Sequence, residues 1–103
     1  MSIAIEKSAQ EGAVTLAVTG EVDVSNASEL RAQIDAVLAE GFTGQLTVDL
    51  SQVPYIDSTG IGVLVGAAHR AQEAGASLAV ANPQKNVERV LGLLGVGADL
   101  NIR

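Results

Sequence analysis

The sequence contains no cysteine, one histidine (His69), one tyrosine and one phenylalanine among its 103 residues. Without cysteine, the chain has no disulfide, no thiol nucleophile and no thiolate ligand for zinc or for an iron–sulfur cluster. A single histidine cannot supply a two-histidine metal site, so we expect no metal and no cofactor. Two aromatic residues also offer no platform on which nucleic-acid bases could stack.

Positive charge is scarce as well. Six Lys and Arg residues stand against twelve Asp and Glu, which gives a formal net charge of −6. The basic residues are scattered singly, whereas a nucleic-acid binder needs a basic stripe that neutralises phosphates. We therefore expect no direct contact with nucleic acid. The negative charge favours partners with a basic docking surface, because opposite charges steer association at long range.

Long apolar runs are missing too. Residues 1–6 do not combine a charged segment with an apolar one, so they do not resemble a signal peptide. The uncharged stretch 58–68 is too short and too rich in glycine to span a bilayer. The composition instead predicts one globular domain over residues 1–103, near the usual size for a single hydrophobic core. We expect a cytoplasmic protein that does not bind membranes.

The pattern of apolar residues predicts an α/β domain. Alternating residues predict strands at 3–8 and 14–19, which the turn signal Glu11-Gly12 joins into an antiparallel hairpin. Beyond the hairpin, strand and helix patterns alternate, which implies right-handed crossovers onto a mostly parallel sheet. We expect four or five strands and three main helices.

Helix boundaries are marked by capping and stop signals. Asn26 and Glu29 form a capping pair before an amphipathic helix that ends at Gly41. In a later helix, Asn82 is expected to be the cap and Pro83 the first helical residue. The remaining predicted elements are strands at 46–50, 77–81 and 100–102, a helix from 58 to about 74, and the end of the last helix at 95–97.

Residues 55–64 (YIDSTGIGVL) carry the most information about function. Asp57, Ser58 and Thr59 lie where a loop becomes a helix, at the carboxyl edge of the sheet where α/β proteins place their sites. One interpretation is purely structural, with Asp57 or Ser58 as an N-cap. Gly60 and Gly62 each cost about 1 kcal/mol of helix propensity relative to alanine, which indicates that the sheet or a partner approaches the backbone closely.

Nucleotide-binding motifs do not explain this segment. Gly60-x-Gly62 resembles a dinucleotide-binding turn, but these glycines lie inside the helix. The next strand also ends in Asn82 instead of an acidic residue for the ribose. The sequence has no Gly-Lys-Ser/Thr, and therefore no P-loop.

Catalytic constellations are equally poor. A nucleophilic Ser58 needs a histidine base, and His69 lies about 16 Å away along the same helix. His69 is better interpreted as a solvated or boundary residue. The carboxylates that could take part in paired-carboxylate catalysis are Glu21, Asp23 and Asp57, and the sequence alone does not exclude it. A chain this small suggests no deep pocket, however, and we expect no enzymatic activity.

Three segments, 20–23 (GEVD), 48–50 (VDL) and 56–64 (IDSTGIGVL), resemble the STAS domain of bacterial anti-sigma factor antagonists. The resemblance covers essentially the whole chain, and the Asp-Ser-Thr-Gly-Ile-Gly block is specific. It implies binding to an anti-sigma factor that is also a serine kinase of the histidine-kinase-like ATPase type, which frees a sigma factor. It further implies that phosphorylation of a serine switches the antagonist off and that a metal-dependent serine phosphatase switches it on again.

The resemblance identifies Ser58 as the phosphorylated residue. If the third strand runs parallel to the second, the loop with Glu21 and Asp23 and the segment with Ser58 lie at the same end of the sheet. The partner-binding residues that the resemblance implies are Glu21, Asp23, Asp57, Ser58, Thr59, Gly60, Ile61 and Gly62. A phosphate brings about −1.5 to −2 charges to a helix N-terminus, which favours anions, so we expect it to act on binding and not on folding. Family members commonly continue into a further helix, whereas this sequence stops at Arg103. An alternative function is that of a STAS scaffold subunit in a stressosome-like or lipid-transport complex.

Overall fold

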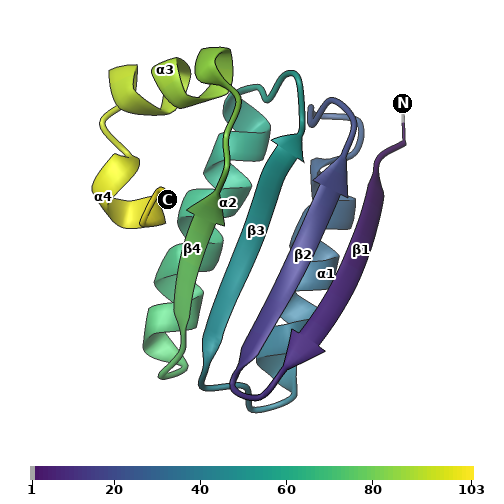
Figure 1. Ribbon diagram of the computed structural model, residues 1–103, viewed down its shortest axis with the longest axis vertical. Helices are drawn as coiled ribbons and strands as arrows, with labels where there is room; N and C mark the ends of the chain where they lie inside the picture. The colour runs from purple at the N-terminus through teal and green to yellow at the C-terminus, as the bar shows by residue number, and fades with distance from the viewer. Residues whose placement is uncertain (1) are drawn as a thin grey trace.

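In the computed structural model, which describes residues 2–103, the chain forms strands and helices in alternation after an initial hairpin (Figure 1). The elements are β1 (Ala4–Gln10), β2 (Ala13–Thr19), α1 (Ala27–Ala39), β3 (Gln45–Gln52), α2 (Ser58–Glu73), β4 (Ser77–Ala81), α3 (Lys85–Leu93) and α4 (Gly97–Leu100). The strands lie in the order β1-β2-β3-β4. β1 pairs antiparallel with β2, whereas β2, β3 and β4 are mutually parallel. The predicted fold class is confirmed.

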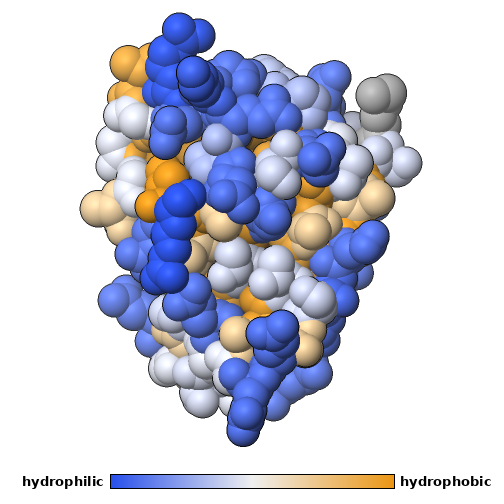
Figure 2. All heavy atoms as spheres, in the orientation of Figure 1, coloured by the Kyte–Doolittle hydropathy of each residue, from blue (hydrophilic) through white to orange (hydrophobic). Residues whose placement is uncertain are grey.

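The two faces of the sheet differ in character. In β2, Leu16 and Val18 are buried on the face that α1 and α2 cover, while Thr15 and Ala17 point the other way and are half-buried. This alternation follows from the two-residue period of a strand. The uncovered face shows blue, white and tan residues in Figure 2, with orange confined to small areas between them. The core therefore lies between the sheet and the two long helices.

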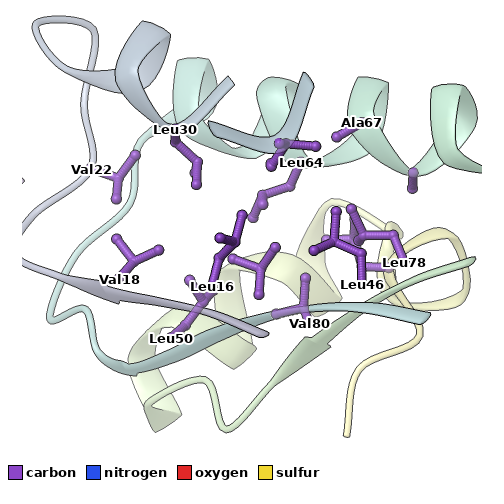
Figure 3. Close-up of a cluster of buried hydrophobic side chains, with 14 of the residues drawn as sticks. Leu16, Val18, Val22, Leu30, Leu46, Leu50, Leu64, Ala67, Leu78 and Val80 are labelled. Carbon is purple, nitrogen blue, oxygen red and sulfur yellow. The ribbon is translucent and has the colours of Figure 1, made fainter. Parts of the chain in front are cut away.

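The core is a layer of aliphatic side chains that point from the helices toward the sheet. Figure 3 shows Leu30 of α1 and Leu64 of α2 on one side of this layer, with Leu16 and Val80 on the other. These four side chains have no exposed surface. Burying each leucine contributes about 1.5–3 kcal/mol to stability, which fixes α2 and its N-terminus against the sheet.

The predicted start of the third helix was wrong. Asn82 is not its cap: it adopts a left-handed conformation (φ +54°), and its N–H donates to the Arg103 carbonyl at 3.1 Å. The backbone therefore continues beyond β4 before it can turn. Helix α3 begins at Lys85, with Gln84 in the cap position and Pro83 outside the helix.

The predicted strand at 100–102 was also wrong. Leu100 ends the short helix α4, and Asn101 has a left-handed conformation (φ +47°) that closes it. Two hydrogen bonds tie this segment to β4: the Arg103 N–H donates to the Val80 carbonyl at 2.9 Å, and the Asn101 side chain donates to the Leu78 carbonyl at 3.2 Å. The C-terminal segment thus covers part of the open edge of β4 without forming a strand. Among residues 2–103, no helix has the length and apolarity that crossing a membrane would require.

Candidate partner-binding site

Two loops lie side by side at the carboxyl ends of β2 and β3, which we call the first loop (residues 20–26) and the second loop (residues 53–57). A short parallel bridge joins them. The Val22 N–H donates to the Tyr55 carbonyl, and the Asp57 N–H donates to the Val22 carbonyl, both at 3.0 Å. Because β2 and β3 are parallel, both loops leave the same edge of the sheet, as expected from the sequence.

Asp57 connects the first loop to the start of α2. Its Oδ1 accepts a hydrogen bond from the Gly60 N–H at 2.9 Å, which makes Asp57 the N-cap. Its Oδ2 accepts from the Val24 N–H at 3.1 Å. Of the two cap candidates in the sequence, Asp57 is therefore the cap, and Ser58 is the first helical residue, with an exposed side chain.

Replacing Asp57 with alanine is expected to lower the free energy of unfolding by about 2 kcal/mol. The loss combines an N-cap, about 0.5–2 kcal/mol, with a second hydrogen bond of about 0.5–1.5 kcal/mol. Urea denaturation of the purified protein measures it. Asp57→Asn keeps an acceptor oxygen and is expected to lose less stability, so equal losses in the two variants would contradict the capping role.

Asn26, which is fully buried, fixes the backbone of the first loop through its side chain. Its Oδ1 accepts from the Asp23 N–H at 2.9 Å, and its Nδ2 donates to the Glu21 carbonyl at 2.8 Å. Asn26 does occupy the N-cap position of α1, but its side chain makes no cap hydrogen bond there. The predicted capping pair with Glu29 therefore placed Asn26 correctly at the N-cap position, but the predicted capping role was wrong. The Asn26 side chain instead shapes the first loop.

Asp23 is ionised more easily than a free carboxyl group. The Ser25 hydroxyl donates to Asp23 Oδ1 at 2.6 Å and the Ser25 N–H donates to the same atom at 2.9 Å. These bonds, the hydroxyl first, lower the pKa of Asp23 below its usual 3.8 because they favour the charged form. The stabilisation that the ionised Asp23 carboxylate gains from these bonds is therefore fully present above the usual pKa of 3.8 and is lost as the pH falls through the lowered pKa.

Ser25→Ala removes the hydroxyl donor and is expected to raise the pKa of Asp23 toward its usual value. Carboxyl carbon shifts in an NMR titration of wild type and variant measure both values. Ser28→Ala, a change to an exposed serine on the first turn of α1, serves as the control. A pKa of Asp23 that is the same in wild type and Ser25→Ala would contradict the assigned cause.

The structure separates the sequence-predicted residues into exposed and buried groups. Gly60 and Ile61 are buried, and a Cβ atom at Gly60 would lie 2.7 Å from Ile56 Cγ1 and 2.8 Å from Val22 Cγ1. Gly60 therefore leaves no room for a side chain, because Ile56 and Val22 of the bridge pack against it, and both Gly60 and Ile61 are core positions. The more accessible residues are Glu21, Ser58, Thr59 and Gly62, which are exposed, and Asp23 and Asp57, which are half-buried.

Two exposed apolar residues of these loops were not among the predicted partner-binding residues. Val24 is 75% exposed and Tyr55 is 50% exposed. The available signal was weak, because both loops also contain buried apolar residues, Val22 in the first and Val53 and Ile56 in the second, and residue type alone does not separate these from exposed ones. Their exposure becomes meaningful only once the two loops are seen to meet.

The arrangement offers an exposed hydroxyl at a helix N-terminus. The N–H groups of Ser58 and Thr59 have no carbonyl partner within α2, because the first turn of any helix lacks such partners. Together with the helix dipole they favour an anion at this position. His69 is exposed and lies further along α2, and no group of three or more His, Cys, Asp or Glu within residues 2–103 is placed to hold a metal ion.

A mixed four-stranded sheet that opens with a hairpin, with its site loops joined at one edge, is the architecture implied by the resemblance to STAS domains. A family model described as "Mlab, STAS domain" matches residues 5–102. The chain therefore belongs to the STAS domain family.

The proteins and solved structures that are similar to this chain include anti-sigma factor antagonists. The chain is 30% identical over 96 residues to the anti-sigma-B factor antagonist of Bacillus subtilis (strain 168), covering 93% of this chain and 86% of that protein. It is 27% identical to a Thermotoga maritima protein proposed to be an anti-sigma factor antagonist, with a TM-score of 0.87, covering 95% of this chain and 84% of that one. The Bacillus protein SpoIIAA in its phosphorylated form shares the fold, with a TM-score of 0.75 at 19% identity, covering 97% of this chain and 91% of that one.

Proposed function

We propose that this protein is an anti-sigma factor antagonist. It binds an anti-sigma factor that is also a serine kinase with a histidine-kinase-like ATPase fold, and this binding releases a sigma factor. The kinase phosphorylates Ser58 and thereby ends the interaction, which a serine phosphatase restores. The protein acts in the cytoplasm as a regulator and carries out no catalysis of its own.

The main support is the position of Ser58. It is exposed on the first turn of α2, next to a first loop that carries Glu21 and Asp23. The chain also matches an anti-sigma-B factor antagonist over 93% of its length. SpoIIAA, which has the same fold and is named an anti-sigma factor antagonist, has been solved in a phosphorylated form. A phosphate on a protein of this fold is therefore compatible with a folded domain.

The choice of Ser58 over Thr59 rests on the family resemblance, because both side chains are exposed at the helix start. Incubation with the cognate kinase and Mg-ATP, followed by phosphopeptide mapping, tests it. We expect one phosphate on the wild type and on Thr59→Ala, and none on Ser58→Ala. A phosphate on Thr59, or an unmodified wild type, would overturn the assignment. A pull-down from lysate, read by mass spectrometry, identifies the kinase to be used.

A second candidate function is that of a STAS scaffold subunit in a stressosome-like or lipid-transport complex. The observation in its favour is that the matched family model is described as "Mlab, STAS domain" and not by a sigma-factor role. The same pull-down separates the two functions. Recovery of a transporter ATPase or of a large STAS assembly, without a kinase, would favour the scaffold.

A further inference from the structure

The large apolar side chains that are most exposed lie in few places. Among residues 2–103 the exposed ones are Val24, Tyr55, Val90, Leu93 and Leu94. Val90 and Leu93 lie on the last turn of α3 and Leu94 is its C-cap, whereas Val24 and Tyr55 come from the two loops that meet beside Ser58. Exposed apolar residues grouped at one position mark interaction surfaces more often than isolated ones do.

Hydrogen bonds hold the backbone of Val24 in place. Its N–H is bound by Asp57 Oδ2 at 3.1 Å, and both neighbouring residues are fixed as well. The Asp23 N–H donates to the Asn26 side chain, and the Ser25 N–H donates to the Asp23 carboxylate, each at 2.9 Å. Turning the Val24 side chain inward would break this network. Its exposure is therefore built into the fold.

The second loop is fixed in a similar way. The Tyr55 carbonyl accepts from the Val22 N–H at 3.0 Å, and the Pro54 carbonyl accepts from the Asn86 side chain of α3 at 2.8 Å. A surface that is already rigid loses little conformational entropy when a partner binds. An aromatic ring at such a position can supply a large contact area for docking.

We propose that Val24 and Tyr55 form an apolar docking pair for the anti-sigma factor, which rests on the proposed function and names the chemistry of its partner surface. The surrounding loops contain carboxylates and no Lys or Arg, since residues 20–26 read GEVDVSN and residues 53–57 read VPYID. The complementary surface on the anti-sigma factor is an apolar patch flanked by basic side chains. A phosphate on Ser58 places charge at the margin of this apolar contact, where removing it from water is costly.

Titration calorimetry of the unphosphorylated protein with its kinase tests the pair. Val24→Thr replaces a methyl group with a hydroxyl at nearly constant shape and is expected to weaken binding about fivefold. Tyr55→Ala is expected to weaken it about 30-fold or more, and Tyr55→Phe, which keeps the ring, to restore it to within about threefold of wild type. Gln10→Ala, an exposed truncation at the opposite end of the sheet, is the matched control and is expected to bind like wild type.

The outcomes separate this proposal from the proposed function. If the wild type neither binds the kinase nor is phosphorylated by it, the proposed function fails and the docking pair fails with it. If the wild type binds and is phosphorylated while Val24→Thr and Tyr55→Ala bind equally well, only the docking pair is overturned. An equal loss in Tyr55→Phe and Tyr55→Ala would also overturn it, because the hydroxyl group would then carry the contact. Amide NMR spectra verify that each variant is folded.

Discussion

Phosphorylation of Ser58 is expected to lower the affinity for the anti-sigma factor by about 100- to 1,000-fold, which corresponds to a loss of about 3–4 kcal/mol. The melting temperature of the domain is expected to change little. Binding and folding separate in this way because Ser58 is exposed on the first turn of α2 and contributes nothing to the core.

The physical reason lies in where the added charge falls. At the start of α2 the helix dipole and the N–H groups of Ser58 and Thr59 stabilise an anion, which offsets repulsion from the neighbouring Asp57. In the complex the same phosphate would meet a surface shaped for an uncharged hydroxyl. Its bulk and the loss of its hydration oppose docking.

Titration of the phosphorylated and unphosphorylated proteins with the kinase partner, together with thermal denaturation of both, measures the two effects. Ser58→Ala is expected to bind like the unmodified protein and to resist phosphorylation. Ser58→Asp is expected to bind weakly and to melt near the wild-type temperature. Unchanged affinity of the phosphoprotein would overturn the switch, and a large drop in melting temperature would show that the phosphate acts by unfolding the domain.

Much of the fold follows from local patterns in the sequence. The predicted strand at 77–81 has the bounds observed for β4, and the turn at Gly12 adopts the positive φ (+73°) that its glycine suggested. These elements have strong periodicity or a glycine that leaves few alternatives. The same patterns predicted that the two loops would share one edge, since parallel strands end together.

The errors arose where contacts between distant residues decide the structure. Asn82 and Pro83 form a good local start signal, but Arg103 binds the backbone at Asn82 and delays the helix. Asn26 likewise matches a cap by position, while its side chain is used to hold the first loop. Local propensity predicts which groups can form a bond, and tertiary packing selects the bond that forms.

The candidate site likewise combines features that local sequence predicts with features that depend on contacts between distant residues. The block around Ser58 could be located from the sequence, because its residue types and its place before a helix are local features. The outward position of Val24 could not, since it depends on a hydrogen bond to Asp57, 33 residues away in the sequence. The spacing of Gly60 and Gly62 indicated a close approach to the backbone, but only the structure shows that the two glycines face different surroundings.

Gly60→Ala and Gly62→Ala are therefore expected to change stability in opposite directions. At position 60 the added methyl group would meet Ile56 at 2.7 Å and Val22 at 2.8 Å, both buried, and overpacking of this kind costs about 1–3 kcal/mol. A gain of up to about 1 kcal/mol in helix propensity offsets part of that cost. At position 62 no atom lies within 4 Å of the added methyl group, so only the gain remains. Thermal denaturation should place the two melting temperatures about 10–20 °C apart.

The affinity of the Gly60→Ala and Gly62→Ala variants for the anti-sigma factor supplies a second measurement. Gly62 is exposed and lies four residues after Ser58, so that both are on the same face of α2. If the anti-sigma factor approaches that face, Gly62→Ala is expected to bind several-fold more weakly although it is the more stable protein. A Gly60→Ala variant as stable as wild type would show that Val22 and Ile56 can move aside, contrary to the packing described for the bridge. Wild-type affinity in Gly62→Ala would remove that glycine from the docking surface and leave its role to helix stability alone.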